Sequence, residues 1–130
     1  MTTGLSAQTV DKKTLSFEAA MKVAAAAAEA RARGIGVVIA VVDYGGHQIA
    51  SVNVGIGKAR TAAIYRRPSK DFEDQIRAGR VATLALTDST QLQGGVPIRL
   101  DGKVIGAIGV SGDTPQVDEA IAIVGANAFK

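Results

Sequence analysis

An arginine on the apolar face of a predicted helix is the clearest candidate for chemistry in this sequence. The helix is expected over residues 55–66. At about 100° per residue, its apolar face consists of Ile56, Ala59, Ala63 and Ile64. The opposite side is expected to carry Lys58, Thr61 and Tyr65. Arg60 points into the apolar face and needs a negative partner there, because an uncompensated buried charge costs several kcal/mol.

Two interpretations of Arg60 stay open. In the first, its guanidinium forms an internal ion pair with Asp43, at the end of a buried strand, or reaches past Ile64 to water. In the second, it faces an anion in a pocket, helped by Arg66 and Arg67. A guanidinium recognises a carboxylate through two parallel hydrogen bonds, so the second interpretation predicts a site for a small anion.

A few other residues could take part in such a site. His47 is the only histidine; it could be a general base, an axial haem ligand, or a surface residue beside a turn. Asp43 and Asp113 are possible bases, but no spacing brings two carboxylates together. Gly94 and Gly95 precede a strand, where they either present backbone N–H groups to an anion or form a bulge or turn.

Composition limits the functions that are open to the chain. Its 130 residues allow one domain, and the core must be built from Ala, Val and Ile because only five residues are aromatic. The net charge of +3 comes without a basic run, which argues against nucleic acid binding. No cysteine is present, and no metal centre is predicted. The absence of a leader or a long apolar run predicts a soluble, cytoplasmic protein without membrane contact.

The elements that must position these residues centre on a β-hairpin. Asp101-Gly102 predicts a type I′ turn, with Leu100 opposite Lys103 and Ile98 opposite Ile105. Strands are expected at Gly36–Asp43, His47–Val54, Val81–Leu86, Val96–Leu100 and Lys103–Val110. Further helices are expected at Thr14–Arg33, with Ser16 as N-cap, at Lys70–Arg77, with Ser69 as N-cap, and after Thr114-Pro115, with Thr114 as N-cap. We therefore predict an α+β domain over residues 14–130, with an antiparallel sheet of about five strands, after a tail or docking arm over residues 1–13.

Seven segments in this order resemble the GlcG/HbpS-like family, which also forms the C-terminal domain of PduO-type proteins. They are Ile39–Asp43, Gly45–His47, Gly57–Ala62, Arg67–Ser69, Gly94–Ile98, Asp101-Gly102 and Gly106–Gly112. The resemblance covers residues 14–125 and implies a profilin-like or PAS-like sandwich and homo-oligomers. For some members it implies haem binding or haem-linked redox sensing. The segment between His47 and Gly57 is about ten residues shorter than the family pattern, and by resemblance it borders the pocket.

These observations predict a homo-oligomeric domain that binds an anionic small molecule, with haem the leading candidate. The ligand-binding residues are predicted to be His47, Lys58, Arg60, Thr61, Arg66, Arg67, Gly94, Gly95, Val96 and Pro97. The alternative is an isomerase, hydratase or lyase acting on a small carboxylate, with His47 or Asp43 as the proton-transfer group.

Overall fold

A four-stranded antiparallel sheet forms the centre of the computed structural model, which describes residues 11–24, 26–35, 37–45, 48–50 and 53–128. The strands are β1 (Val38–Asp43), β2 (Gln48–Ala50), β3 (Gly95–Leu100) and β4 (Lys103–Ser111). Their order is β2-β1-β4-β3, so β4 lies inside the sheet and β3 at its edge. The predicted α+β class is confirmed.

The predicted hairpin joins β3 to β4. Asp101 and Gly102 have φ angles of 49° and 76°, as a type I′ turn requires, and Leu100 lies opposite Lys103. The other predicted pair is wrong, because Ile98 lies opposite Gly106 rather than Ile105. A register shift between Ile98 and Arg99 gives β4 one extra residue, which is the signature of a β-bulge.

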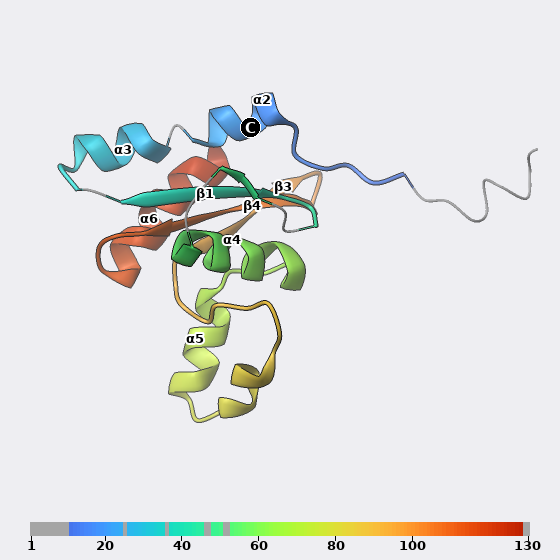
Figure 1. The fold of residues 1–130 in the computed structure, drawn as a ribbon, viewed down its shortest axis with the longest axis vertical. Helices are drawn as coiled ribbons and strands as arrows, with labels where there is room; N and C mark the ends of the chain where they lie inside the picture. The colour runs from blue at the N-terminus through green and yellow to red at the C-terminus, as the bar shows by residue number, and fades with distance from the viewer. Residues whose placement is uncertain (1–10, 25, 36, 46–47, 51–52, 129–130) are drawn as a thin grey trace, which may run out of the picture.

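Helices cover both faces of the sheet (Figure 1). On one side lie α2 (Phe17–Val23) and α3 (Ala26–Ala32), which share their core with α6 (Pro115–Asn127). On the other side α4 (Asn53–Tyr65) packs on a small core of Val42, Ala59, Ala62, Ala63 and Ala107. Two of the three predicted N-caps are confirmed, since Ser16 accepts from Ala19 N and Thr114 from Val117 N. Ser69 precedes α5, but its side chain makes no cap hydrogen bond.

Glycine brings α4 unusually close to the sheet. A Cβ on Gly109 would lie 2.0 Å from the carbonyl oxygen of Gly55 and 2.6 Å from the amide nitrogen of Ala59. Any side chain on Gly109 would therefore push α4 away from β4. The short helix-to-sheet distance decides which α4 side chains are buried.

Three predicted elements need correction. Val81–Leu86 is not a strand: residues Val81–Ala85 form a 3₁₀ helix after α5 (Lys70–Arg77), away from the sheet, and leave Val81 and Leu84 exposed. A short apolar run fits several structures, and here no strand lies beside it. The described part of the sheet therefore has four strands rather than about five.

The other two corrections concern helix and strand ends. The helix predicted over Thr14–Arg33 is two helices, α2 and α3, because Ala24 caps α2 within an alanine run that carries no local signal for a break. The strand predicted over His47–Val54 is limited to β2 in the described residues, and α4 already begins at Asn53. No helix in the described ranges is both long and apolar enough to span a membrane.

Candidate functional site

The buried charge of α4 is Lys58. Ile56, Ala59 and Ala63 are buried as predicted, but the prediction that Arg60 enters the buried face while Lys58 and Thr61 lie opposite it is wrong. Lys58 is only 4% exposed, Thr61 is fully buried, and Arg60 is partly exposed. Ile64, assigned to the apolar face, is exposed. The close approach at Gly109 favours small residues on the buried face, so Ala59, Ala62 and Ala63 lie there and Ile64 does not.

Lys58 forms an internal ion pair with Asp118 of α6. Its Nζ donates to Asp118 Oδ2 and to the carbonyl oxygen of Val110, both at 2.9 Å. Asp118 is 2% exposed, and its other carboxylate oxygen accepts from the amide of Asp113 at 3.0 Å. The polar partners of this pair are thus supplied by the chain itself, from β4, from α6 and from the loop between them.

Gly94 and Gly95 complete the same assembly, which we call the Lys58 joint (Lys58, Ser69, Gly94, Gly95 and Asp118). The Gly95 amide donates to Ser69 Oγ at 2.8 Å, and the Ser69 amide donates to the Gly95 carbonyl at 3.0 Å. A Cβ on Gly95 would lie 2.1 Å from the carbonyl oxygen of Lys58. The Gly95 N–H group is therefore committed to Ser69, and the glycine serves close packing.

The remaining predicted site residues lie in several different places. Thr61 Oγ1 donates to the Gly57 carbonyl and accepts from the Thr90 amide, both at 2.7 Å. The Arg67 guanidinium lies 4.1 Å from the centre of the Phe72 ring. Asp43 Oδ1 accepts from the Gly45 amide at 2.9 Å.

The predicted ligand-binding residues also line separate hollows. Arg60 lines a hollow of about 370 Å³ with Asn53, Ile56, Gly57, Asp88, Ser89 and Thr90. Val96 and Pro97 line another, of about 120 Å³, against α6. Arg66 lines a third and larger one, and His47 lies outside the described residues.

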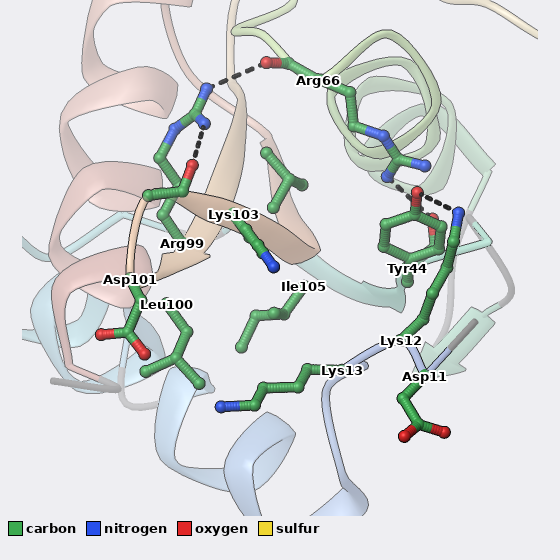
Figure 2. A pocket seen from close by; sticks show the side chains of 12 residues that line it. Asp11, Lys12, Lys13, Tyr44, Arg66, Arg99, Leu100, Asp101, Lys103 and Ile105 are labelled. Carbon is green, nitrogen blue, oxygen red and sulfur yellow. Dashed lines mark hydrogen bonds between the residues drawn. The ribbon is translucent and has the colours of Figure 1, made fainter. Parts of the chain in front are cut away.

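The cavity that Arg66 lines has a volume of about 540 Å³, and lysine and arginine side chains from several segments line it (Figure 2). We call it the basic pocket. It is lined by Asp11, Lys12, Lys13, Tyr44, Arg66, Arg99, Leu100, Asp101, Gly102, Lys103, Val104 and Ile105. Five of these residues are cationic and two are carboxylates, and three aliphatic residues from the β3–β4 hairpin form an apolar wall. Such a lining suits a ligand that is both anionic and apolar.

Two arginines of the basic pocket are held by backbone carbonyls. Arg66 directly follows α4 with a φ of 59°, and its Nη1 donates to the Tyr44 carbonyl at 3.1 Å. Arg99 Nη2 donates to the Arg66 carbonyl at 2.9 Å, and its Nη1 donates to the Gly102 carbonyl at 3.3 Å. These bonds link the end of α4, the end of β1 and the hairpin turn into one wall.

Tyr44 lies between two of the cations. Lys12 Nζ donates to Tyr44 Oη at 3.0 Å, and the Arg66 guanidinium stacks 3.6 Å from the centre of the ring. The hydrogen bond from Lys12 is the largest cause that lowers the pKa of the Tyr44 phenol below its ordinary value. Desolvation opposes it, and the charges of Arg66 and Lys12 add smaller lowering effects.

Lys13 and Lys103 differ from the other cations of the basic pocket, because no described residue pairs with them. Within the described ranges, neither ammonium group makes a hydrogen bond or an ion pair. Figure 2 shows Lys103 and Ile105 between the side of the pocket formed by Tyr44 and the side formed by Arg99 and Leu100. These two lysines are therefore available to an anion.

Comparison with known proteins identifies the relatives of this chain. A family model described as "Haem degrading protein HbpS-like" matches residues 15–127. The chain belongs to the HbpS-like family. Its sequence is 42% identical to protein GlcG of Escherichia coli K12 over 83 residues, which cover 56% of this chain and 62% of GlcG. The match thus spans less than two thirds of the GlcG length.

Solved structures agree with this assignment. The HbpS crystal structure matches the HbpS-like chain with a TM-score of 0.84 and 26% identity, over 95% of this chain and 96% of HbpS. A crystal structure of a PduOC–haem complex matches with a TM-score of 0.76 and 24% identity, over 88% and 94% of the two chains. At that identity the second match concerns the fold alone.

Sequence reasoning found Arg66 in the basic pocket of this HbpS-like chain but missed most of the other cations. Arg99 and Lys103 flank the Asp101-Gly102 turn, so the hairpin prediction already placed them side by side. Tyr44 and Lys12 carry no such signal, because they meet only through the packing of the N-terminal segment on the end of β1. Among the described residues, no group of three or more His, Cys, Asp or Glu side chains is placed to hold a metal ion.

Proposed function

We propose that this HbpS-like chain binds haem in the basic pocket. The observation that carries the proposal is the lining itself: five cations surround an apolar wall in a cavity of about 540 Å³. Haem has two propionate groups and a large apolar ring, so it matches a pocket with a cationic rim and aliphatic side chains.

Each part of the lining has a separate task in this proposal. Lys13 and Lys103, which have no recorded internal partner, hold the carboxylates. Leu100, which is half-buried, contacts the ring, and the buried side chains of Val104 and Ile105 complete the apolar wall. Arg66 and Arg99 are fixed by backbone carbonyls and add positive potential without moving.

The comparisons support the same ligand. The family description names haem degradation, and the PduOC–haem complex is a protein of this fold with haem bound. When bound, haem would supply a redox-active iron. Redox sensing, which the resemblance implies for some members, is therefore open to the protein under this proposal.

A titration of the protein with ferric haem, followed by the Soret absorbance, tests the proposal. We expect the Lys13→Ala, Lys103→Ala double variant to bind haem at least about tenfold more weakly, because a charge-assisted hydrogen bond contributes roughly 1.5–3 kcal/mol. Lys70→Ala is the matched control, since Lys70 lies on α5 and pairs with Asp74. Haem dimethyl ester, which lacks the carboxylates, should bind the native protein as weakly as haem binds the double variant. Equal affinity for haem and its ester would overturn the proposal.

The alternative ligand is a small carboxylate turned over by an enzyme of isomerase, hydratase or lyase type. The cations of the basic pocket would suit it equally well, and His47 or Asp43 would have to move the proton. A panel of small 2-hydroxy and 2-oxo acids beside the haem titration separates the two. Consumption of one acid that His47→Ala or Asp43→Ala abolishes would favour the enzyme.

We also propose that the protein forms a homo-oligomer through α2. Phe17 and Met21 are 63% and 60% exposed beside an apolar hollow of about 200 Å³ formed with α3 and β1. A second copy would bury this surface, because large contiguous apolar patches are rare on monomers. Light scattering should give a mass above that of one chain, and Phe17→Lys, Met21→Lys should reduce it to one chain. The cytoplasmic location stays a prediction.

A further inference from the structure

We propose that Tyr44 is the residue that ligates the haem iron, with Lys12 and Arg66 as the residues that position and activate its phenol oxygen. The inference rests on the proposed haem function and names the iron contact within the same pocket. Haem iron is ligated in proteins by His, Cys, Met or Tyr side chains. Among the described residues that line the basic pocket, Tyr44 is the only one of these types.

The position of Tyr44 is fixed from both ends of its backbone. Its amide donates to Thr14 Oγ1 at 3.0 Å, and its carbonyl accepts from Arg66 Nη1 at 3.1 Å. It directly follows β1, the strand paired with β4 at the centre of the sheet. A ligand on such a rigid support costs little entropy when iron binds.

The phenol is also prepared chemically. A phenol ligates ferric iron after it has lost its proton, and two cations favour that loss. Lys12 Nζ donates to Oη at 3.0 Å, and the Arg66 guanidinium covers the ring at 3.6 Å (Figure 2).

The charges around Tyr44 come from every element that packs against it. The groups that line the same pocket are Asp11, Lys12 and Lys13 from the N-terminal segment, Arg66 from the end of α4, and Arg99, Asp101 and Lys103 from the hairpin. Asp43, the last residue of β1, directly precedes Tyr44. The excess of cations over carboxylates among these groups stabilises a phenolate.

Ligation requires no oxidant or reductant. The Tyr44 hydroxyl releases its proton to solvent, and the oxygen donates an electron pair to ferric iron while the iron keeps its oxidation state. Lys12 can continue to donate to a second lone pair of the same oxygen. The negative phenolate also offsets the positive charge of the ferric centre inside a cationic pocket.

Resonance Raman spectroscopy of the ferric haem complex tests this assignment, because an iron–phenolate bond has its own vibrations. We expect these vibrations in the native protein and in Tyr65→Phe, the matched control, and we expect Tyr44→Phe to lack them. Haem affinity of Tyr44→Phe should fall by no more than about tenfold, since the cations that hold the propionates remain. Its circular dichroism should match that of the native protein, because the variant removes one exposed hydroxyl.

Three results would overturn the assignment, and each has a distinct meaning. Haem bound by the native protein without phenolate vibrations would reject Tyr44 and leave the proposed function intact. Vibrations that persist in Tyr44→Phe would assign the ligand to another tyrosine, and an iron–imidazole spectrum lost in His47→Ala would assign it to His47. No binding of haem by the native protein would reject both proposals.

Discussion

The Lys58 joint and the basic pocket contain the same kinds of charged groups but use them differently. In the joint, one lysine meets one carboxylate at 2.9 Å, and both side chains are almost fully buried. In the basic pocket, five cations face two carboxylates, and at least two lysines have no recorded partner among the described residues. Charge balance, rather than the presence of a cation, therefore separates the structural assembly from the candidate site.

The comparison also separates two uses of the segments that carry the family resemblance. Gly57–Ala62 and Gly94–Ile98 supply the joint, where they hold α4, β3 and α6 together. The basic pocket shares one of these segments, the Asp101-Gly102 turn, and draws its other residues from the end of β1, from Arg66 after α4, from the hairpin strands and from the N-terminal segment. A recognisable motif can thus specify a fold while neighbouring residues specify what the fold binds.

Asp118→Ala should have the largest effect on stability, because it leaves the Lys58 ammonium buried without its counter-charge. We expect a loss of about 3–5 kcal/mol in the free energy of unfolding. Urea denaturation monitored by circular dichroism measures this loss. Asp74→Ala, which removes the exposed partner of Lys70 on α5, is the control and should cost less than about 1 kcal/mol.

The double variant Lys58→Met, Asp118→Leu sharpens this comparison. Apolar residues of similar volume need no counter-charge, so the double variant should be clearly more stable than Asp118→Ala. If Asp118→Ala lowered the free energy of unfolding by no more than Asp74→Ala does, the buried ion pair of the Lys58 joint would not stabilise the fold as its geometry indicates.

Gly95→Ala should have the next largest effect. The new Cβ would lie 2.1 Å from the Lys58 carbonyl, so α4 and β3 must separate, and overpacking of this kind costs about 1–3 kcal/mol. Gly102→Ala is the comparison at the pocket end of β3: its Cβ would meet open space, but its φ of 76° costs about 1–2 kcal/mol. Denaturation of both variants should show the same slope and a lower midpoint for Gly95→Ala. The opposite ranking would contradict the close packing at Gly95.

The sequence predicted the framework well where the signal was local. The Asp101-Gly102 turn, the N-caps Ser16 and Thr114 and the bounds of α5 depend on residues close together in the chain, and the structure confirms them. The Val81–Leu86 strand was wrong, because an apolar run does not reveal whether a partner strand lies beside it. The bulge at Ile98 depends in the same way on packing between elements.

The candidate site was harder to predict, for a related reason. The helical projection of α4 assumed that the largest apolar side chains face the sheet, whereas Gly109 brings the helix so close that small residues must do so. Lys58 is then buried, and its partner Asp118 lies sixty positions away in the sequence. The cations of the basic pocket come from three separated segments, and local spacing brings together only those within one segment, such as Arg99 and Lys103 of the hairpin.

The smallest predicted effect is a shift in the pKa of Tyr44, which tests how the cations of the basic pocket act on a neighbouring side chain. The pKa of the Tyr44 phenol lies below its ordinary value of 10.0, chiefly because Lys12 donates to its oxygen. Replacing this lysine, Lys12→Met, should raise the pKa of Tyr44 back toward 10.0. The chain contains two tyrosines and no tryptophan, so the ultraviolet absorbance of tyrosinate, with Tyr44→Phe and Tyr65→Phe as references, resolves each phenol.

The sign of the accompanying change in stability follows from proton binding. Between the lowered pKa of Tyr44 and its ordinary value, the unfolded chain binds more protons at this phenol than the folded protein does. The phenol therefore contributes stability that is fully present above the ordinary value and is lost as the pH falls through the lowered pKa. Lys12→Met should narrow that pH window, whereas Lys70→Met on α5 should leave it unchanged. If Tyr44 titrated identically in the native protein and in Lys12→Met, Lys12 would not act on the phenol. The cations of the basic pocket would then not influence its tyrosine in the way that we infer.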